Sequence, residues 1–365
     1  MLGPSILFIT HAEGGGIERH LIEKLLALHR AGEDWLVLRP GGFGEDAVLY
    51  TSNPLLPERH FRLPAEAPGL EDLLRRTVRR IEVHHLRSHD PFVRALPERL
   101  GLPYSVTLHD YATICPRANL VGPDGRYCGE PELAACERCV STYAAAPVAA
   151  PGGVAALRRD SRRLLRGAEE VQVPSPDARR RFARHFPEIA VRLGEWEGPV
   201  VPLPARPEAL PRVCVAGNLT RAKGFDVLRA CAQDAAERSL GLDFVVVGRS
   251  QDDTALRETG RCEVIGPYPE AEGPAWLAAQ RGAIGFLPSV YPETWCYALG
   301  VMQRAGLPLA TFDLGAQAAR VRESGGVVLP LGLPPARIND VFLRMMQRDP
   351  QPAKRTPEPA ETVCA

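Results

Sequence analysis

The stretch SILFITHAEGGGIERHLIEKLLALHRAGEDWLVLRP, residues 5–40, decides the fold class. Its first residues, SILFIT, are apolar and suit a short buried strand, and the glycines that follow predict a turn. The segment IERHLIEKLLALHRAG has the apolar period of an amphipathic helix that ends at Gly32, and WLVLRP is a second strand. A strand, a helix and another strand in this order form a βαβ unit, which indicates a parallel sheet covered by helices.

The same alternation of strands and helices runs through both halves of the chain. In the first half we predict a helix near 70–80, a strand at IEVHHLRSH, a helix at PFVRALPERLG and a strand at YSVTLHD. After an irregular segment, VAALRRDSRRLLRGAEEVQVPSPDARRRFARHF predicts a helix, a strand and a helix. The second half restarts with the strand RVCVAGN and alternates up to the helix PPARINDVFLRMMQRD. No period of roughly 20 to 50 residues recurs, which excludes a solenoid.

Two doubly wound α/β domains in tandem are therefore predicted, because 365 residues exceed one ordinary domain. We place the first at 1–195 and the second at 212–348, on either side of a proline-rich linker at 196–211. The polar residues 349–365 are expected to be disordered. The absence of a long helix after the last predicted one suggests a module of a longer protein. Facing domains of this kind bind ligands in a cleft at the carboxyl ends of their strands.

Charge and hydropathy exclude several classes of function. Lys plus Arg and Asp plus Glu both number 44, so no charge excess indicates a nucleic-acid partner. The clusters LRRTVRR and DARRRFARHF are interpreted as solvated helix faces, with contact to a membrane surface or an anionic acceptor as the alternative. No run of about 18 apolar residues and no signal-peptide pattern is present. We expect a cytoplasmic enzyme, with a peripheral position on the inner face of the membrane as the alternative.

An acidic residue precedes a buried helix in the second half. Glu293 lies in SVYPETWCYALGVMQRAGLP, residues 289–308, between a proline and an apolar run. A glutamate at such a strand-to-helix junction stabilises the helix N-terminus through the macrodipole, or it binds a ligand. The residues of this stretch alone leave both interpretations open.

Two glycine-rich turns end predicted strands. Gly15 and Gly16 in THAEGGGIERH precede a helix, so their backbone amides suit an anion or the close approach of a sugar, although a tight turn explains them equally well. The spacing is not the G-x-G-x-x-G dinucleotide fingerprint. The turn in VAGNLTRAKGFDVL adds Lys223, which either neutralises a phosphate or is simply solvated.

Taken together, the motifs resemble a known family. GGGIERH, VTLHDY, VQVPSPDAR, AGNLTRAKGFDVL, FVVVGR, CEVIGPY and YPETWCYALG with AGLP occur in the order of GT-B glycosyltransferases and closely resemble glycosyltransferase family 4, from about residue 5 to residue 330. HDYATICPRANLVGPDGRYC followed by CERC is similar to the bacterial members that build surface polysaccharides. The resemblance implies two Rossmann-like domains that face a central cleft.

The resemblance also implies an activity. A retaining enzyme of this family moves a hexosyl or deoxyhexosyl group from a nucleotide-diphosphate sugar to a glycan or a lipid-linked glycan, and we expect no catalytic metal. Other glycosyltransferase modules are expected partners. The alternative is a degenerate GT-B module that binds a glycan or a protein partner without transfer.

Site residues follow from the motifs. The resemblance implies that His109 lies near the donor sugar, oriented by Asp110, and that Glu293 contacts sugar hydroxyls; a buried structural histidine is the alternative for His109. The backbone from Cys262 to Ile265 would meet the nucleobase. The implied donor-binding residues are Gly15, Gly16, Asn218, Arg221, Lys223, Gly248, Cys262, Ile265, Thr294 and Val301.

Two positions depart from the family pattern. Val301 stands where the family has a second glutamate, which holds the ribose, so we expect a deoxythymidine diphosphate sugar to be preferred over ribose donors. Asn218 stands where the family has an arginine that clamps the diphosphate, and Arg221 is the expected substitute.

Four cysteines are closely spaced in the irregular segment of the first half. They follow the pattern C-x12-C-x7-C-x2-C, and the last two form a CxxC pair of the kind that holds one side of a tetrahedral zinc site: Cys115, Cys128, Cys136 and Cys139. We expect a structural zinc that clamps a loop beside the acceptor cleft. Free thiols and disulfides are the alternatives.

Overall fold

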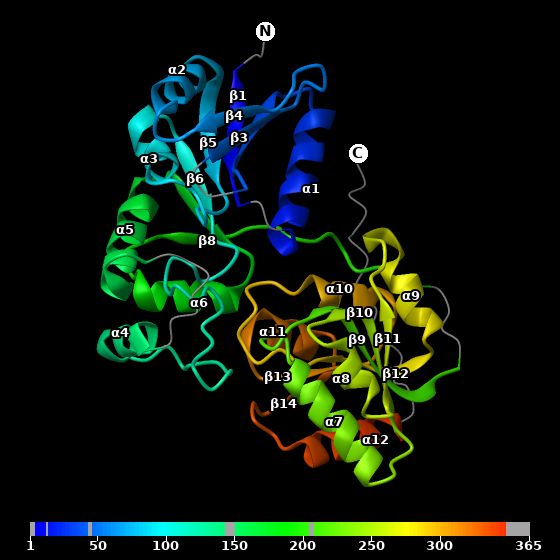
Figure 1. Cartoon of the computed structure of the whole chain (residues 1–365). Helices are drawn as coiled ribbons and strands as arrows, with labels where there is room; N and C mark the ends of the chain where they lie inside the picture. The colour runs from blue at the N-terminus through cyan, green and yellow to red at the C-terminus, as the bar shows by residue number, and fades with distance from the viewer. Residues whose placement is uncertain (1–3, 12–13, 43–45, 143–149, 204–207, 348–365) are drawn as a thin grey trace, which may run out of the picture. The chain divides into compact units, whose positions relative to one another are not determined.

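The computed structural model describes residues 4–11, 14–42, 46–142, 150–203 and 208–347. Residues 349–365, for which we expected disorder, lie outside the described residues. The chain divides into two compact units, the first made of Met1–Gly198 with Tyr291–Tyr297 and the second of Pro199–Val290 with Ala298–Ala365 (Figure 1). Each unit is built around its own sheet.

The first unit contains an eight-stranded sheet with the order β4-β3-β2-β1-β5-β6-β7-β8. Its strands from β2 through β1 to β8 are parallel, whereas β3 pairs antiparallel with β2 and with β4. The order reverses at β1, whose two neighbours are β2 and β5, which makes the carboxyl end of β1 the switch point. The strands are β1 Ser5–Ile9, β2 Trp35–Pro40, β3 Asp46–Thr51, β4 Arg59–Arg62, β5 Val78–Val83, β6 Tyr104–Thr107, β7 Glu170–Val173 and β8 Val191–Leu193.

Helices cover both faces of this sheet, as the alternation within β1 requires. Ile6 and Phe8 pack with Leu21 of α1, whereas Leu7 and Ile9 belong to the core cluster that includes Leu70 of α2. Figure 1 shows α1 on one side of the sheet and α2 and α3 on the other. The helices of this unit are α1 Gly16–Arg30, α2 Ala67–Thr77, α3 Pro91–Leu100, α4 Leu133–Thr142, α5 Gly153–Gly167 and α6 Pro176–His185.

The second unit contains a six-stranded sheet, parallel throughout, with the order β11-β10-β9-β12-β13-β14. Here β9 lies between β10 and β12, so the switch point is at its carboxyl end. The strands are β9 Leu210–Leu219, β10 Asp243–Ser250, β11 Cys262–Gly266, β12 Gly282–Leu287, β13 Leu309–Phe312 and β14 Val327–Leu329.

One face of the second sheet packs against α7 and α12 through a cluster that contains Leu228 and Phe342. Phe342 lies 5.0 Å from Phe286 of β12, ring centroid to ring centroid. The helical elements of this unit are α7 Phe225–Glu237, α8 Asp253–Arg257, the 3-10 turn Glu270–Glu272, α9 Gly273–Ala279, α10 Tyr297–Arg304, α11 Gly315–Glu323 and α12 Pro335–Met346. The prediction of two doubly wound α/β domains is confirmed.

Some boundaries were predicted wrongly. The helix near 70–80 ends at Thr77, and Val78 begins β5 instead, because β-branched Val78 continues into the apolar alternation of a strand. The strand that we extended through IEVHHLRSH ends at Val83. The irregular segment with the cysteines contains the helix α4.

Candidate functional site

Histidines gather at the switch point of the first sheet. His11 follows β1, His84 and His85 follow β5, and His109 follows β6. Because these three strands are parallel neighbours, their carboxyl ends bring the four side chains to one edge. The amides of His84 and His85 both donate to the carbonyl of Ile9, which fixes the chain at this corner.

Two side-chain pairs order this edge. Nδ1 of His84 lies 2.9 Å from Nε2 of His109, and Nε2 of His85 lies 3.1 Å from Oδ2 of Asp110. The expectation that Asp110 orients His109 is therefore wrong, since the carboxylate faces His85 and accepts a second hydrogen bond from the amide of Ala112. His84 is the residue that contacts the ring of His109.

Trp196 closes the histidine cluster. Its indole stacks on the ring of His20 at 4.3 Å with an interplanar angle of 14° and meets His109 edge-on at 5.6 Å. Trp196 is buried, and the first unit extends to Gly198, so the first residues of the expected linker belong to this unit.

Burial keeps the imidazoles of His20, His84, His89 and His109 neutral. It lowers the pKa of His20 to about 3 and the pKa of His89 to about 4, and it lowers the pKa values of His84 and His109 as well. A neutral imidazole has one protonated and one unprotonated nitrogen. Each of these rings therefore carries a potential donor at one nitrogen and a potential acceptor at the other.

Glu82 places a negative charge next to His84. Burial by itself raises the pKa of Glu82, but the neighbouring His84 and Lys24 outweigh burial and lower the pKa to about 2. Nζ of Lys24 lies 2.7 Å from Oε2 of Glu82, and Nε2 of His84 lies 3.6 Å from the same oxygen. Glu82 is thus an ionised carboxylate next to a buried imidazole.

The segment with Glu293 belongs to the first unit by its contacts. The hydroxyl of Thr294 donates to the carbonyl oxygen of His109, which brings the segment Tyr291–Tyr297 to the histidine edge. Glu293 is buried, with 3% of its surface exposed. Because α10 begins at Tyr297, Glu293 lies outside the first turn of that helix, which weighs against the helix-capping interpretation.

The glycine turn before α1 has the backbone that the sequence predicted. Gly15 has φ of 98°, a conformation that favours glycine, and it occupies the N-cap position without a side-chain cap. Gly15 and Gly16 are both exposed. Their amides are available to a ligand at the N-terminus of α1.

Glycines with positive φ end three adjacent strands of the second unit. Gly217, Gly248 and Gly266 have φ of 94°, 141° and 106° at the carboxyl ends of β9, β10 and β11. A Cβ atom on Gly248 would lie 2.0 Å from the carbonyl oxygen of Gly217, so only glycine fits there. Asn218 follows Gly217 and is exposed. This edge therefore presents backbone at the switch point.

The loop that carries Lys223 is fixed by its neighbours. Gly224 has φ of 90°, and a Cβ atom there would lie 2.1 Å from the carbonyl oxygen of Pro288. The amide of Val290 donates to the carbonyl of Ala222 at 2.9 Å, which joins the loop to the chain after β12. Arg221 is exposed and pairs with Asp226 at 3.0 Å, so its guanidinium is already engaged by a carboxylate.

The other predicted donor residues lie deeper. Val301 is 3% exposed, and a Cβ atom added to Gly273 of α9 would lie 2.9 Å from its Cγ1 and 2.6 Å from Cε2 of Tyr268. Val301 thus lies close to Gly273 and Tyr268. Cys262 is buried in the core of this unit, and Ile265 is partly exposed.

Comparison with solved structures identifies the architecture. The chain is similar to HepE of Anabaena in complex with UDP and glucose, with 13% identity, 94% of this chain and 90% of that chain covered and a TM-score of 0.58. For sucrose-phosphate synthase of Thermosynechococcus elongatus the identity is 16%, 94% of this chain and 90% of that chain are covered, and the TM-score is 0.60. For TarM of S. aureus the identity is 11%, 84% of this chain and 58% of that chain are covered, and the TM-score is 0.53. The chain has the GT-B fold. No protein-family model and no curated protein sequence matches it.

The cysteine-rich loop of this GT-B chain differs from the prediction. Burial raises the pKa of the Cys115 thiol to about 11, and the nearby thiols of Cys128, Cys136 and Cys139 act in the same direction. However, within the described ranges no three side chains of His, Cys, Asp or Glu are placed to hold a metal ion. Sγ of Cys136 instead contacts the carbonyl of Pro131 at 3.5 Å and Nη2 of Arg158 at 3.6 Å. The predicted zinc site is therefore not supported, and all four thiols are free.

An ion-pair network holds this loop. Glu130, whose side chain is 1% exposed, lies 2.5 Å from Nη1 of Arg181, 2.8 Å from Nε2 of His185 and 2.7 Å from the hydroxyl of Tyr127. Arg181 and His185 belong to α6, so the carboxylate ties the loop to this helix. The charge pattern of the sequence did not reveal this network, because the partners are far apart along the chain.

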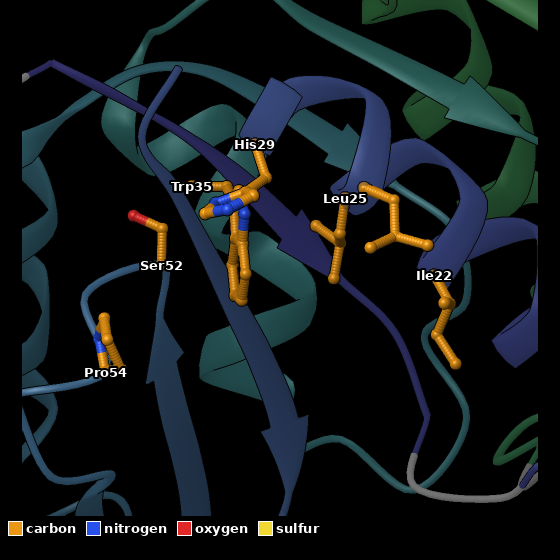
Figure 2. Close-up of a pocket in the computed structure, with 7 residues that line it drawn as sticks. Ile22, Leu25, His29, Trp35, Ser52 and Pro54 are labelled. Atoms are coloured by element: carbon orange, nitrogen blue, oxygen red, sulfur yellow. The ribbon is translucent and has the colours of Figure 1, made fainter. Parts of the chain in front are cut away.

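A separate hollow lies at the other end of α1. It has a volume of about 320 Å³ and is lined by Ile22, Leu25, Leu26, His29, Trp35, Ser52 and Pro54. Figure 2 shows His29 and Leu25 of α1 facing it together with Trp35 at the start of β2. The start of β2 is opposite to the carboxyl ends that carry the histidines, so this hollow does not contribute to the candidate site. No helix in the described part of the chain has the length and apolar character needed to cross a membrane.

Proposed function

We propose that this GT-B chain is a retaining glycosyltransferase of family 4 type, which moves a sugar from a nucleotide-diphosphate donor to a glycan or lipid-linked glycan acceptor in surface polysaccharide synthesis. The observation that carries the proposal is the hydrogen bond from Thr294 to the carbonyl of His109. It brings His109 and Glu293, the residue before Thr294, into one unit, although His109 and Glu293 are far apart in the sequence. The fold agrees, since HepE, with the same architecture, was crystallised with UDP and glucose.

Each site residue has a proposed role. Glu293 holds hydroxyls of the donor sugar, and His109 contacts the same sugar. In the second unit, Lys223 neutralises the diphosphate above the glycine edge of β9 and β10. Lys223 is positioned by the next residue, Gly224. Only glycine fits there, because a Cβ atom would clash with the carbonyl oxygen of Pro288. Arg221 reaches the phosphates only by exchanging its pair with Asp226, so we assign the diphosphate to Lys223 and backbone amides.

Val301 determines the nucleotide preference. Its side chain is apolar and buried beside Gly273 and Tyr268, so it accepts no hydrogen bond from a ribose hydroxyl. A buried hydroxyl without a partner costs about 1 to 3 kcal/mol. A donor with deoxythymidine diphosphate avoids part of this cost because it lacks the 2′-hydroxyl.

The acceptor side is formed by the first unit. The cysteine-rich loop, held by Glu130, borders the edge with His109, because it begins directly after Asp110. A lipid-linked acceptor also implies contact with a membrane surface and with other glycosyltransferase modules. We propose these partners together with the acceptor.

The test is a donor panel. Purified protein is incubated with UDP, GDP and dTDP sugars, and release of the nucleoside diphosphate is measured with and without glycan acceptors. We expect release from at least one donor, and its loss in Lys223→Met. Arg212→Met serves as the control, since Arg212 lies at the opposite, amino-terminal part of β9. Binding of nucleotide without any release would favour the module that binds a glycan or protein partner without transfer.

A further inference from the structure

Four side chains form a continuous array that ends at His109. Lys24 contacts Glu82 at 2.7 Å, Glu82 lies 3.6 Å from Nε2 of His84, and Nδ1 of His84 lies 2.9 Å from Nε2 of His109. The side chain of His84 is 0% exposed, so water does not compete for either of its nitrogens. Nε2 of His84 has no hydrogen-bond partner within the described residues, and the carboxylate of Glu82 is the charged group beside it, at 3.6 Å and therefore beyond hydrogen-bond distance.

The charge of Glu82 determines which nitrogens carry protons. A carboxylate is an acceptor only, and an unprotonated imidazole nitrogen facing it would place two lone pairs against one another. His84 is therefore protonated on Nε2. Because buried His84 is neutral, its Nδ1 is unprotonated and accepts a hydrogen bond, which His109 donates from Nε2. His109 is neutral as well, so its Nδ1 is left unprotonated.

We propose that Glu82 and His84 are positioning residues that hold His109 as its Nε2-protonated tautomer, so that Nδ1 of His109 accepts a hydrogen bond from a hydroxyl of the bound sugar. The proposal rests on the proposed function, which places His109 at the sugar. Its new content is the direction of the contact. Because its Nε2–H is donated to His84, His109 accepts a hydrogen bond from the ligand hydroxyl at Nδ1 and donates none to the ligand.

The pair of His85 and Asp110 supports the assignment of His84 as the partner of His109. Asp110, the carboxylate adjacent to His109 in the sequence, is committed to His85 at 3.1 Å. His20 meets the ring of His109 edge-on at 5.2 Å, a packing contact and not a hydrogen bond. Within the described residues, His84 is the side chain placed to set the tautomer of His109.

The first test is spectroscopic and uses the unaltered protein. Two-bond proton–nitrogen correlation on protein labelled with ¹⁵N-histidine distinguishes a protonated from an unprotonated ring nitrogen, and the resonances that disappear in His109→Gln assign His109. We expect a protonated Nε2 and an unprotonated Nδ1. A protonated Nδ1, with or without a protonated Nε2, overturns the proposal.

The second test changes the start of the array. The amide of Glu82→Gln can donate to Nε2 of His84, so we expect the proton between the two rings to redistribute, the His109 tautomer to shift and kcat/KM to fall about tenfold. Glu71→Gln is the matched control. The side chains of Glu71 and Glu82 are both 16% exposed and ion-paired, but Glu71 lies on α2 and is not part of the array. An unchanged tautomer in Glu82→Gln overturns the proposal. A shifted tautomer with unchanged kcat/KM overturns the contact with the sugar, and with it the assigned role of His109, while the array itself stands.

Discussion

Oε2 of Glu130 lies 2.8 Å from Nε2 of His185, which ties a buried carboxylate in the cysteine-rich loop to the last residue of α6. Burial by itself raises the pKa of Glu130, but His185, Tyr127 and Arg181 outweigh burial and lower the pKa to about 2. The loop is thus held by charge, in the place where the cysteine spacing predicted a metal.

Replacing this carboxylate is expected to destabilise the first unit. Glu130→Gln removes the carboxylate that pairs with Arg181 and His185 and leaves Asp177 as the remaining ion-pair partner of Arg181, so we expect the free energy of unfolding to fall by about 1.5 to 3 kcal/mol, the contribution of hydrogen bonds to a charged group. Urea unfolding at pH 7 measures the change. Glu132→Gln, at an exposed position of the same loop, is the control and should leave the midpoint unchanged. Equal stability of both variants would show that Glu130 does not hold the loop.

The buried histidines predict sensitivity to mild acid. They are neutral when folded but protonate near pH 6.5 when unfolded, so the unfolded chain binds more protons below this pH and the free energy of unfolding falls. Between pH 7.5 and 5.0 the expected loss is about 2 kcal/mol for each histidine that stays neutral. This range lies above the ordinary pKa of the carboxylates, so Glu82 and Glu130 do not contribute to the change.

Urea unfolding at the two pH values checks this. His20→Phe should reduce the difference by about 2 kcal/mol, because it removes one such group. His60→Gln is the control, since the side chain of His60 is 61% exposed. If His20→Phe and the unaltered protein lose the same stability, His20 does not stay neutral in the fold.

The lysine loop depends on one glycine. Gly224→Ala places a methyl group against the carbonyl of Pro288 in a backbone conformation with positive φ. We therefore expect the free energy of unfolding to fall by at least about 2 kcal/mol. Nucleotide binding should weaken too, because Lys223 moves with the loop. Gly241→Ala, where a Cβ atom meets nothing within 4 Å, should change neither quantity. If Gly224→Ala binds nucleotide as tightly as the unaltered protein, the loop with Lys223 does not contribute to donor binding.

Glu293 is expected to act in turnover more than in folding. Glu293→Gln keeps the shape of the side chain but removes its charge, and hydrogen bonds to a charged group contribute about 1.5 to 3 kcal/mol, so turnover should fall tenfold or more. The melting temperature should change little. Unchanged turnover together with a lower melting temperature would make Glu293 a structural residue.

We expect the nucleotide preference to depend on Val301. Titration calorimetry with dTDP, UDP and GDP should show the tightest binding for dTDP, by about tenfold. Val301→Glu should shift the preference toward UDP and GDP, because a carboxylate accepts hydrogen bonds from both ribose hydroxyls. The experiment is valid only if Val301→Glu retains its thermal unfolding transition, which is measured alongside. Tighter binding of UDP or GDP than dTDP by the unaltered chain would contradict the assignment.

Periodicity was sufficient to predict most of the fold. The strand at Ser5–Ile9, the helix that follows and the second-unit strands from Leu210–Leu219 through Leu309–Phe312 were visible, because buried parallel strands are short apolar runs and their helices are amphipathic. The strands Asp46–Thr51, Arg59–Arg62, Val191–Leu193 and Val327–Leu329 were missed, and the last three of them lie at sheet edges. An edge strand carries polar residues and has no strong pattern, as RHFR illustrates.

The candidate site was only partly predictable. His109 was found by resemblance, but its partners His84 and His20 were missed, although VHHLRSH placed three histidines after a strand. Which of them meets His109 depends on the pairing of β5 with β6, and a sequence does not give that register. The same holds for Asp110, whose neighbour along the chain is not its partner in space.

The assignment of Tyr291–Tyr297 to the first unit has a consequence for how the chain is made. A ribosome delivers residues up to Gly198 first, so the nascent first unit waits for a short peptide that emerges only after most of the second unit has been synthesised. During this interval the carbonyl of His109 lacks the hydroxyl of Thr294. Translation pausing or early cleavage would thus yield a first unit that lacks the segment Tyr291–Tyr297 at its histidine edge, and a single cut does not divide the chain into its two units.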